Sequence, residues 1–387
     1  MAGPRAYLDH NASAPLLPAA RAAVVAALDV AANPSSVHSE GRAARKIVED
    51  ARRDVAALVG AKAEHIVFTS SATEAATTLL SPDWRIGRAA VRMSRLYVTE
   101  ADHPCVLNGG RFPAERITRL GVDSNGIIDL MALQAALGAH DKSEGLPLVA
   151  LHGANNETGV VQPFSAIAEL VKAAGGVLVL DAVQAAGRIP LDISAGCADY
   201  LILSSHKIGG PKGAGAIVAI ADLMMPVPLV SGGGQEKGHR GGTENLQAIA
   251  GFGAAARDAL AGLAEMERVR ALRDRIEATV IRLAPDAEIF GKAVERLANT
   301  TFFAIPGVKA ETAQIAFDLA GVALSAGSAC SSGKVGPSHV LKAMGFADNL
   351  GALRVSIGRD TTEADVEKFE TALAALLARR TDRTKAA

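Results

Sequence analysis

Cysteine is scarce in this sequence of 387 residues, which contains only Cys105, Cys197 and Cys330. The three lie far apart, are odd in number and form no CxxC pair. The sequence therefore indicates neither a disulfide framework nor a cysteine zinc site, and we expect no bound metal. So few cysteines fit a reducing compartment, and we expect a cytoplasmic location.

An excess of charge of either sign is also lacking, because 40 Lys and Arg residues balance 41 Asp and Glu residues. Proteins that bind nucleic acid or anionic membranes usually carry a basic patch, so we expect neither partner. No uninterrupted apolar run reaches the ~18–20 residues of a membrane-spanning helix. The N-terminus reaches Asp9 and His10 before any apolar stretch begins, so no secretory signal is expected.

Short β-branched runs alternate with helical periods through the first two thirds of the chain. Several of these runs are apolar throughout, which is typical of parallel strands buried on both faces. The expected strands are residues 65–69, 96–99, 148–152, 177–180, 200–203 and 216–220. This alternation predicts an α/β domain with a mostly parallel sheet.

The pattern changes in the last third, where two amphipathic helices and isolated strands replace the alternation. The helices are expected at residues 266–283 and from 361 onward, with strands at 300–305 and 353–357. This mixture is typical of a smaller α+β domain. We therefore expect a large α/β domain over residues 15–255 and a small domain over residues 1–14 and 256–387.

Two charged residues lie where expected strands end, the edge at which ligands gather in an open parallel sheet. Asp181 closes strand 177–180, and a carboxylate there is costly unless it meets a cation or several donors. It is either a capping residue or the partner of a protonated ring nitrogen. Lys207 follows strand 200–203, and it is either solvated or a partly desolvated amine able to form a Schiff base.

Two further strand ends carry polar residues, each of which has either a structural role or a role in binding or catalysis. Thr73 lies where a helix begins after strand 65–69, and this is either an ordinary capped start or a phosphate site. His103 follows strand 96–99 and is either a structural hydrogen-bonding residue or a stacking or acid–base group. A Schiff-base lysine, an acidic partner and a phosphate site are what pyridoxal phosphate (PLP) needs, so PLP is the predicted cofactor.

Recognisable motifs are spread along almost the whole chain. They include Asn155-Asn156-Glu157-Thr158-Gly159, His206-Lys207-Ile208, Arg240-Gly241-Gly242-Thr243-Glu244-Asn245, Ser328-Ala329-Cys330 and Arg354-Val355-Ser356. Together they resemble the NifS/IscS-like cysteine desulfurases, which belong to the class-V aminotransferases of PLP fold type I. The resemblance implies a large domain with a mostly parallel sheet, a small α+β domain carrying the cysteine loop, and a homodimer with active sites at the interface.

The same resemblance implies a role for each matching residue. Lys207 would hold PLP as a Schiff base, Asp181 would pair with the pyridine nitrogen, and Gln184 would bond the phenolic oxygen. His103 would stack on the ring and share in proton transfer. The phosphate would be held by Ala72, Thr73, Ser204 and His206 of the same subunit, and by Thr243 reaching in from the partner subunit. Asn156 would lie near cofactor and substrate, and the substrate carboxylate would be bound by Arg354, with Asn33 as a second candidate.

Cys330 is either a small buried hydrophobic residue or a nucleophile, and its serine- and glycine-rich neighbours favour a pliable loop. The resemblance implies that it takes the sulfur atom of L-cysteine as a persulfide, that L-alanine leaves, and that an iron–sulfur scaffold or thiolation protein receives the sulfur. Cys105 and Cys197 are expected to be inert. The alternatives are a selenocysteine lyase or other β-elimination, and a degenerate sulfur-carrier or interaction subunit that catalyses nothing.

Overall fold

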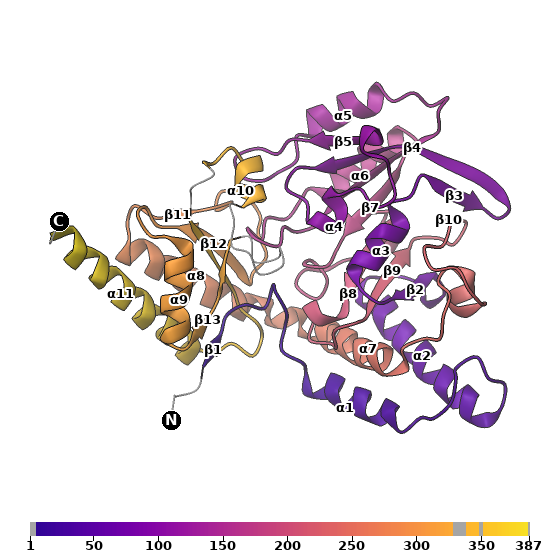
Figure 1. Ribbon diagram of the computed structural model, residues 1–387, viewed down its shortest axis with the longest axis horizontal. Helices are drawn as coiled ribbons and strands as arrows, with labels where there is room; N and C mark the ends of the chain where they lie inside the picture. Colours follow the sequence, from indigo (N-terminus) through magenta and orange to yellow (C-terminus); the bar gives the residue numbers. More distant parts are fainter. Residues whose placement is uncertain (1–4, 328–337, 348–350, 386–387) are drawn as a thin grey trace.

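A nine-stranded sheet lies at the centre of the larger part of the molecule (Figure 1). The structure is a computed structural model that describes residues 5–327, 338–347 and 351–385. The strands of this sheet are β2 (Ile66–Thr69), β3 (Asp83–Ile86), β4 (Ala89–Thr99), β5 (Ile117–Leu120), β6 (Leu146–His152), β7 (Val177–Asp181), β8 (Tyr200–Ser204), β9 (Gly215–Ala219) and β10 (Met224–Pro226). Their order is β10-β3-β4-β6-β7-β8-β9-β2, with β5 paired to β4.

The centre of the sheet is parallel, as the sequence predicts, and its two sides are antiparallel. β5, β4, β6, β7 and β8 form the parallel ladders, whereas β9 and β2 on one side and β3 and β10 on the other pair antiparallel. Parallel neighbours need crossover helices, here α5 (Leu130–Gly138) before β6 and α6 (Phe164–Ala173) before β7. The carboxyl ends of β6, β7 and β8 consequently lie at one edge.

Successive side chains of the central strands pack into two different cores. In β6, Val149 and Leu151 belong to one core, whereas Leu148 and Ala150 belong to the other. The first core is covered by α2 (Ser39–Leu58), α5, α6 and α7 (Leu246–Ala261), and α1 (Pro18–Leu28) packs on α7. The second core is covered by α3 (Ala72–Leu79) and α4 (Pro104–Leu107). Burial on both faces explains the apolar runs of the sequence.

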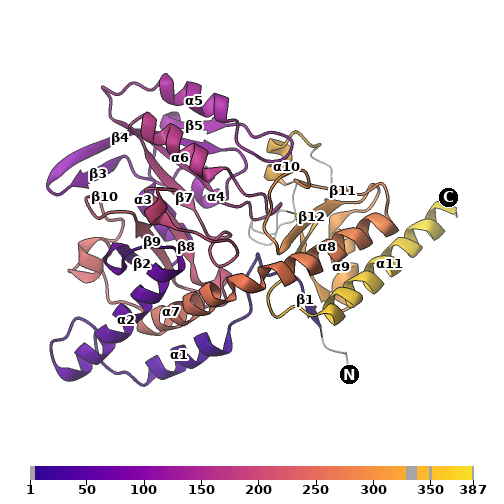
Figure 2. The same cartoon turned by 180° about the vertical axis from the view of Figure 1, so that it is seen from behind.

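A smaller unit with its own core follows α7, and Figure 2 shows α8 (Met266–Leu283) leading into it. Its four-stranded antiparallel sheet consists of β11 (Glu288–Ile289), β12 (Thr300–Ala304), β15 (Ala352–Ser356) and β14 (Ser325–Ala326). The N-terminal strand β1 (Ala6–Tyr7) pairs in parallel with β13 (Val322–Ala323). The remaining helices are α9 (Ala310–Leu319), α10 (His339–Ala343) and α11 (Glu363–Lys385). The expected domain boundaries stay a prediction.

The N-terminal segment passes from this smaller unit to the larger one. His10 N–H donates to the Ser356 carbonyl on β15, and Ala14 N–H donates to the His206 carbonyl just after β8. Residues of both units therefore meet at the carboxyl edge of the large sheet. Among the residues that the structure describes, no helix is long and apolar enough to cross a membrane.

Candidate active site

A cavity of about 320 Å³ lies at the carboxyl ends of β6, β7 and β8. Most of the residues expected to hold a cofactor line it together. These are Ala72, Thr73, His103, Asn156, Asp181, Gln184, Ser204, His206 and Lys207. The fold thus gathers side chains that are up to 135 positions apart in the sequence.

Lys207 is placed by a single 3-10 turn that follows β8 directly. Its Nζ donates to the Asn11 carbonyl at 2.6 Å and to the Ala12 carbonyl at 2.9 Å. The side chain is half-buried. The N-terminal segment therefore holds the amine at the cavity wall, which distinguishes Lys207 from an ordinary solvated surface lysine.

Asp181 is the buried last residue of β7. Burial raises the pKa of this carboxyl, and the nearby His103 ring and the Val183 N–H act in the opposite direction. Among the described residues, its one hydrogen bond comes from the Val183 N–H, at 3.0 Å. A buried carboxylate with so few donors suits a cation placed opposite it in the cavity.

His103 caps the N-terminus of α4 and faces the same cavity. Its Nδ1 accepts the Cys105 N–H at 3.2 Å and lies 3.0 Å from Cys105 Sγ. Because Nδ1 is an acceptor, the proton of the neutral ring is on Nε2. Burial raises the pKa of the Cys105 thiol, so at neutral pH the thiol can also donate to Nδ1. Cys105, which the sequence left without a role, is thus part of the site.

A buried network at the cavity wall, which His152 helps to line, was not found from the sequence. Asp102 accepts the Thr99 N–H at 2.7 Å, the His152 N–H at 2.8 Å and the His152 Nδ1–H at 2.5 Å. Gln162 donates from Nε2 to His152 Nε2 at 3.0 Å, which fixes the imidazole as the neutral Nδ1–H form. His152 closes β6 just as Asp181 closes β7, and that position was the signal in the sequence.

A candidate anion site lies at the start of α3. Ser71 caps this helix by accepting the Glu74 N–H at 3.1 Å, and Ala72 and Thr73 follow at the cavity wall. The helix begins against Gly215 of β9, where a Cβ would lie 2.5 Å from the Ser71 carbonyl carbon. Burial and the neighbouring Lys207 lower the pKa of His206 to about 4, so its ring is neutral at pH 7. Backbone N–H groups and hydroxyls at a helix start suit a phosphate.

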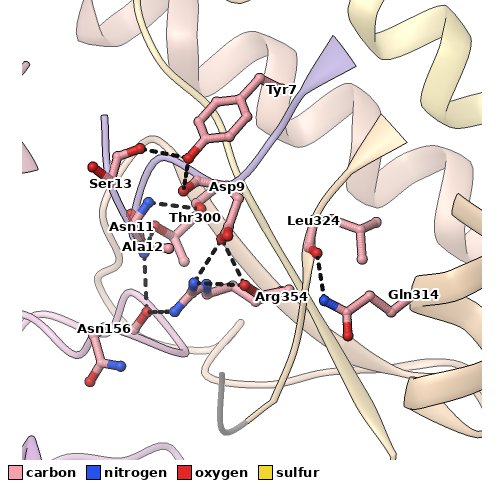
Figure 3. Close-up of polar contacts among 12 residues, drawn as sticks. Tyr7, Asp9, Asn11, Ala12, Ser13, Asn156, Thr300, Gln314, Leu324 and Arg354 are labelled. Atoms are coloured by element: carbon pink, nitrogen blue, oxygen red, sulfur yellow. Dashed lines mark hydrogen bonds and ion pairs between the residues drawn. The ribbon is translucent and has the colours of Figure 1, made fainter. Parts of the chain in front are cut away.

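Arg354 lies in β15 with its guanidinium fully buried and fixed by three acceptors (Figure 3). Nη2 donates to Asp9 Oδ1 at 2.8 Å and to Ser325 Oγ at 3.1 Å, and Nη1 donates to the Asn156 carbonyl at 3.0 Å. Nε is buried and has no partner among the described residues. Of the described residues that line the cavity, Asn156 is one and Arg354 is not, so the arginine lies behind the wall.

Besides Arg354, two other expected site residues, Thr243 and Asn33, do not line this cavity in the described chain. Thr243 is exposed and lines a separate pocket of about 140 Å³, together with Arg240. Asn33 is exposed and its Oδ1 accepts the Ser35 N–H at 2.8 Å, as in a turn. Cys330 lies outside the described residues.

A model of the class-V aminotransferase family matches residues 6–369. The chain belongs to this family. A cysteine desulfurase of Cereibacter sphaeroides is 40% identical over 374 residues, with 94% of both chains covered. An IscS-like cysteine desulfurase of Mycobacterium tuberculosis is 36% identical over 383 residues, covering 97% of this chain and 96% of the relative. These relatives confirm the resemblance drawn from the motifs.

The class-V fold is also confirmed by solved structures. A NifS-like protein from Rickettsia africae superimposes with a TM-score of 0.86 at 31% identity, covering 97% of this chain and 99% of that one. A second NifS-like protein gives a TM-score of 0.84 at 28% identity, with the same coverage. The α/β architecture with a second, smaller unit, expected from the sequence, is that of these NifS-like proteins.

Proposed function

We propose that the protein is a PLP-dependent cysteine desulfurase that converts L-cysteine to L-alanine and carries the removed sulfur on Cys330. The observation that carries this proposal is the pairing of Lys207 and the buried Asp181 on the wall of one cavity. Curated relatives 36–40% identical over nearly the whole chain are cysteine desulfurases, which supports the same reaction.

The residues of the cavity fit PLP at each end of that molecule. Asp181 offers a buried carboxylate for the ring nitrogen, and the start of α3 offers N–H donors for the phosphate. Lys207 would bind the aldehyde, and Ala72, Thr73, Ser204 and His206 would hold the phosphate. Bound PLP supplies an electron sink for the carbanion formed at the substrate α-carbon.

Proton movement would be the work of His103 and Lys207. The Nδ1 atom of His103 is occupied by the Cys105 N–H, so its Nε2 holds the proton that can be donated. The Lys207 amine, held by carbonyls of the N-terminal segment, would take the α-proton of the substrate and return a proton to it. Asn156 at the wall and Arg354 behind it would bind the substrate carboxylate. The Nε of Arg354, which has no partner among the described residues, offers a donor.

The sulfur transfer would balance within substrate and enzyme. The Cys330 thiolate forms a bond to the substrate sulfur while the carbon–sulfur bond breaks. The carbon keeps the electron pair and takes a proton, so L-alanine leaves and Cys330 carries a persulfide. A scaffold for iron–sulfur clusters or a thiolation protein of the cytoplasm would then receive the sulfur atom.

A homodimer would complete the phosphate site. Within the described chain, Thr243 is exposed and lies outside the cavity, so it is available to another subunit. Thr243 of the partner subunit would then donate to the phosphate, which is the role that the family resemblance implies.

The test is incubation of the PLP-loaded protein with L-cysteine, followed by assay of alanine and by mass analysis of Cys330. We expect alanine, a persulfide on Cys330, and loss of the persulfide in Cys330→Ser. Lys207→Ala should lose the borohydride-stable cofactor adduct. Cys197→Ser is the matched control, because Cys197 is buried away from the cavity. Full sulfide production by Cys330→Ser, or a colourless wild-type protein, would contradict the proposal, and faster turnover of selenocysteine would favour a selenocysteine lyase.

A further inference from the structure

Arg188 is a buried arginine in the turn that follows β7, directly behind the cavity wall. Its Nη1 donates to the Gln184 carbonyl at 2.9 Å and to Gln184 Oε1, and its Nη2 donates to the Lys207 carbonyl at 3.3 Å. Among the described residues, no carboxylate forms an ion pair with it; its described partners are these three oxygens. A buried cation held only by oxygens of two proposed cofactor residues is costly, and its location suggests a function.

The contacts of Gln184 fix which way its amide faces. Arg188 has only N–H donors, so the amide atom that it contacts is the oxygen. The other amide atom contacts the Asn11 carbonyl at 3.0 Å, which can only accept, so this atom is the nitrogen. One N–H of that nitrogen is not used by Asn11. Gln184 lines the cavity, and no described residue is bonded to this second N–H, which leaves it as a donor for an acceptor oxygen there.

Arg188 also adds positive charge beside Lys207. Charged and titratable groups surround the two residues: Arg354 on β15, His10 with Asp9 and Asp360 beside it, Arg359, His206 and Lys212. Asp181, His103 and Cys105 lie across the cavity. Burial, together with Arg354, lowers the pKa of Arg188 to about 9, which leaves it charged at neutral pH. Burial lowers the pKa of His10 and of His206, so neither ring adds charge at pH 7.

We propose that Arg188 is a positioning residue that holds the amide of Gln184 with its N–H toward the phenolic oxygen of PLP and keeps a positive charge beside Lys207. This inference rests on the proposed function. Both effects favour the unprotonated form of the lysine–PLP linkage, since a donor stabilises the phenolate and a nearby cation disfavours a second positive charge. Arg188 thus acts through Gln184 and Lys207 and does not itself contact the reacting atoms.

The experiment is a pH titration of the visible absorbance of the PLP-loaded protein, with PLP affinity and thermal unfolding measured alongside. In Arg188→Met we expect the titration midpoint to rise by about one pH unit and PLP to bind about tenfold more weakly. Arg188→Lys retains a cation, so its titration midpoint should rise less. This variant replaces Arg188→Met in the test if Arg188→Met does not fold. Gln184→Glu retains an acceptor for Arg188 but has no N–H, so its midpoint should also rise.

The matched control is Arg273→Met. Arg273 is likewise buried and donates to a main-chain carbonyl, that of Leu297 at 2.9 Å, but it lies in α8, away from the cavity. This variant should lose thermal stability and keep the wild-type midpoint. If Arg188→Met and Arg188→Lys lose stability but keep the wild-type midpoint, Arg188 is only structural and the inference is overturned. A wild-type protein without a PLP absorbance band would overturn the proposed function, and this inference with it.

Discussion

Disruption of the buried ion pair between Glu236 and Arg52 should lower the free energy of unfolding strongly, although neither residue lines the cavity. The pair is bidentate, with both N–O distances at 2.8 Å, and the side chains are 2% and 8% exposed. Glu236 also accepts the Phe68 N–H at 2.8 Å, and Arg52 donates to the Ile66 carbonyl at 2.7 Å. The pair therefore ties β2 to the segment that presents Thr243 seven positions later.

The expected magnitude follows from what each substitution leaves behind. Glu236→Gln leaves the buried Arg52 guanidinium with only the half-exposed Glu49 carboxylate, 3.4 Å from Nε. Arg52→Leu leaves the Glu236 carboxylate buried with only the Phe68 N–H. Loss of one partner of a buried pair costs about 3–5 kcal/mol. The double variant buries no unpaired charge and loses mainly the bond to Ile66, about 1–3 kcal/mol. The two single costs should therefore exceed the double cost by about 3 kcal/mol or more.

The assay is urea unfolding of the PLP-free protein, comparing midpoints for variants whose slopes match that of the wild type. Glu236→Gln should also bind PLP more weakly, because Thr243 would no longer be held in place for the partner subunit. Arg257→Leu is the control: Arg257 pairs with Asp54 on the same helix α2 as Arg52, but its side chain is 70% exposed, so its loss should cost at most about 1 kcal/mol. If the losses of unfolding free energy in the two single variants add up to the loss in the double variant within about 0.5 kcal/mol, the reasoning is refuted.

Two further predictions concern pH and substrate binding. The pKa of His206 is about 4 in the folded PLP-free protein and 6.5 in a free chain, so only the unfolded chain takes up this proton between those values. Stability should fall as pH drops from 6.5 to 4, and the thermal midpoint of His206→Asn should fall less over that window; parallel curves would contradict this. Arg354→Gln should raise the KM for L-cysteine about tenfold or more with a smaller change in kcat, measured by alanine formation, and an unchanged KM would contradict its role.

Residues that end buried strands could be placed from the sequence. Apolar runs marked the parallel strands, and parallel strands end at one edge, so Asp181, Ser204 and Lys207 were expected near one another and do line one cavity. His152 closes β6 in the same way, but a histidine at a strand end can be structural or catalytic, so its position alone did not predict a role. Its role in the wall is set by Asp102, which lies in the turn after β4 and becomes its neighbour only in the fold.

The contacts of Arg354 and Arg188 could not be placed in this way. Arg354 was expected to bind the substrate carboxylate, but the sequence does not show that its guanidinium lies behind the wall and pairs with Asp9, 345 positions away. Arg188 carries no motif, and its importance comes from the orientation of the Gln184 amide and from the Lys207 carbonyl. Spacing in the sequence reports the periodicity of strands and helices. The contact of Arg354 with Asp9 instead depends on the tertiary fold, and the contacts of Arg188 depend on the turns that follow β7 and β8.

Cys105 shows that the protonation state of a cysteine matters as much as its location. A second thiol in a cavity that handles sulfur could compete with Cys330 for the sulfur atom, because the thiolate is the reactive form. Burial raises the pKa of Cys105, and the carboxyl groups of Asp181 and Asp102 act in the same direction, while only His103 opposes them. The thiol therefore stays protonated at neutral pH, donates to His103 Nδ1 and is a poor nucleophile. Expecting Cys105 to be inert is consistent with its protonation, but the contact that makes it part of the site could be seen only in the fold.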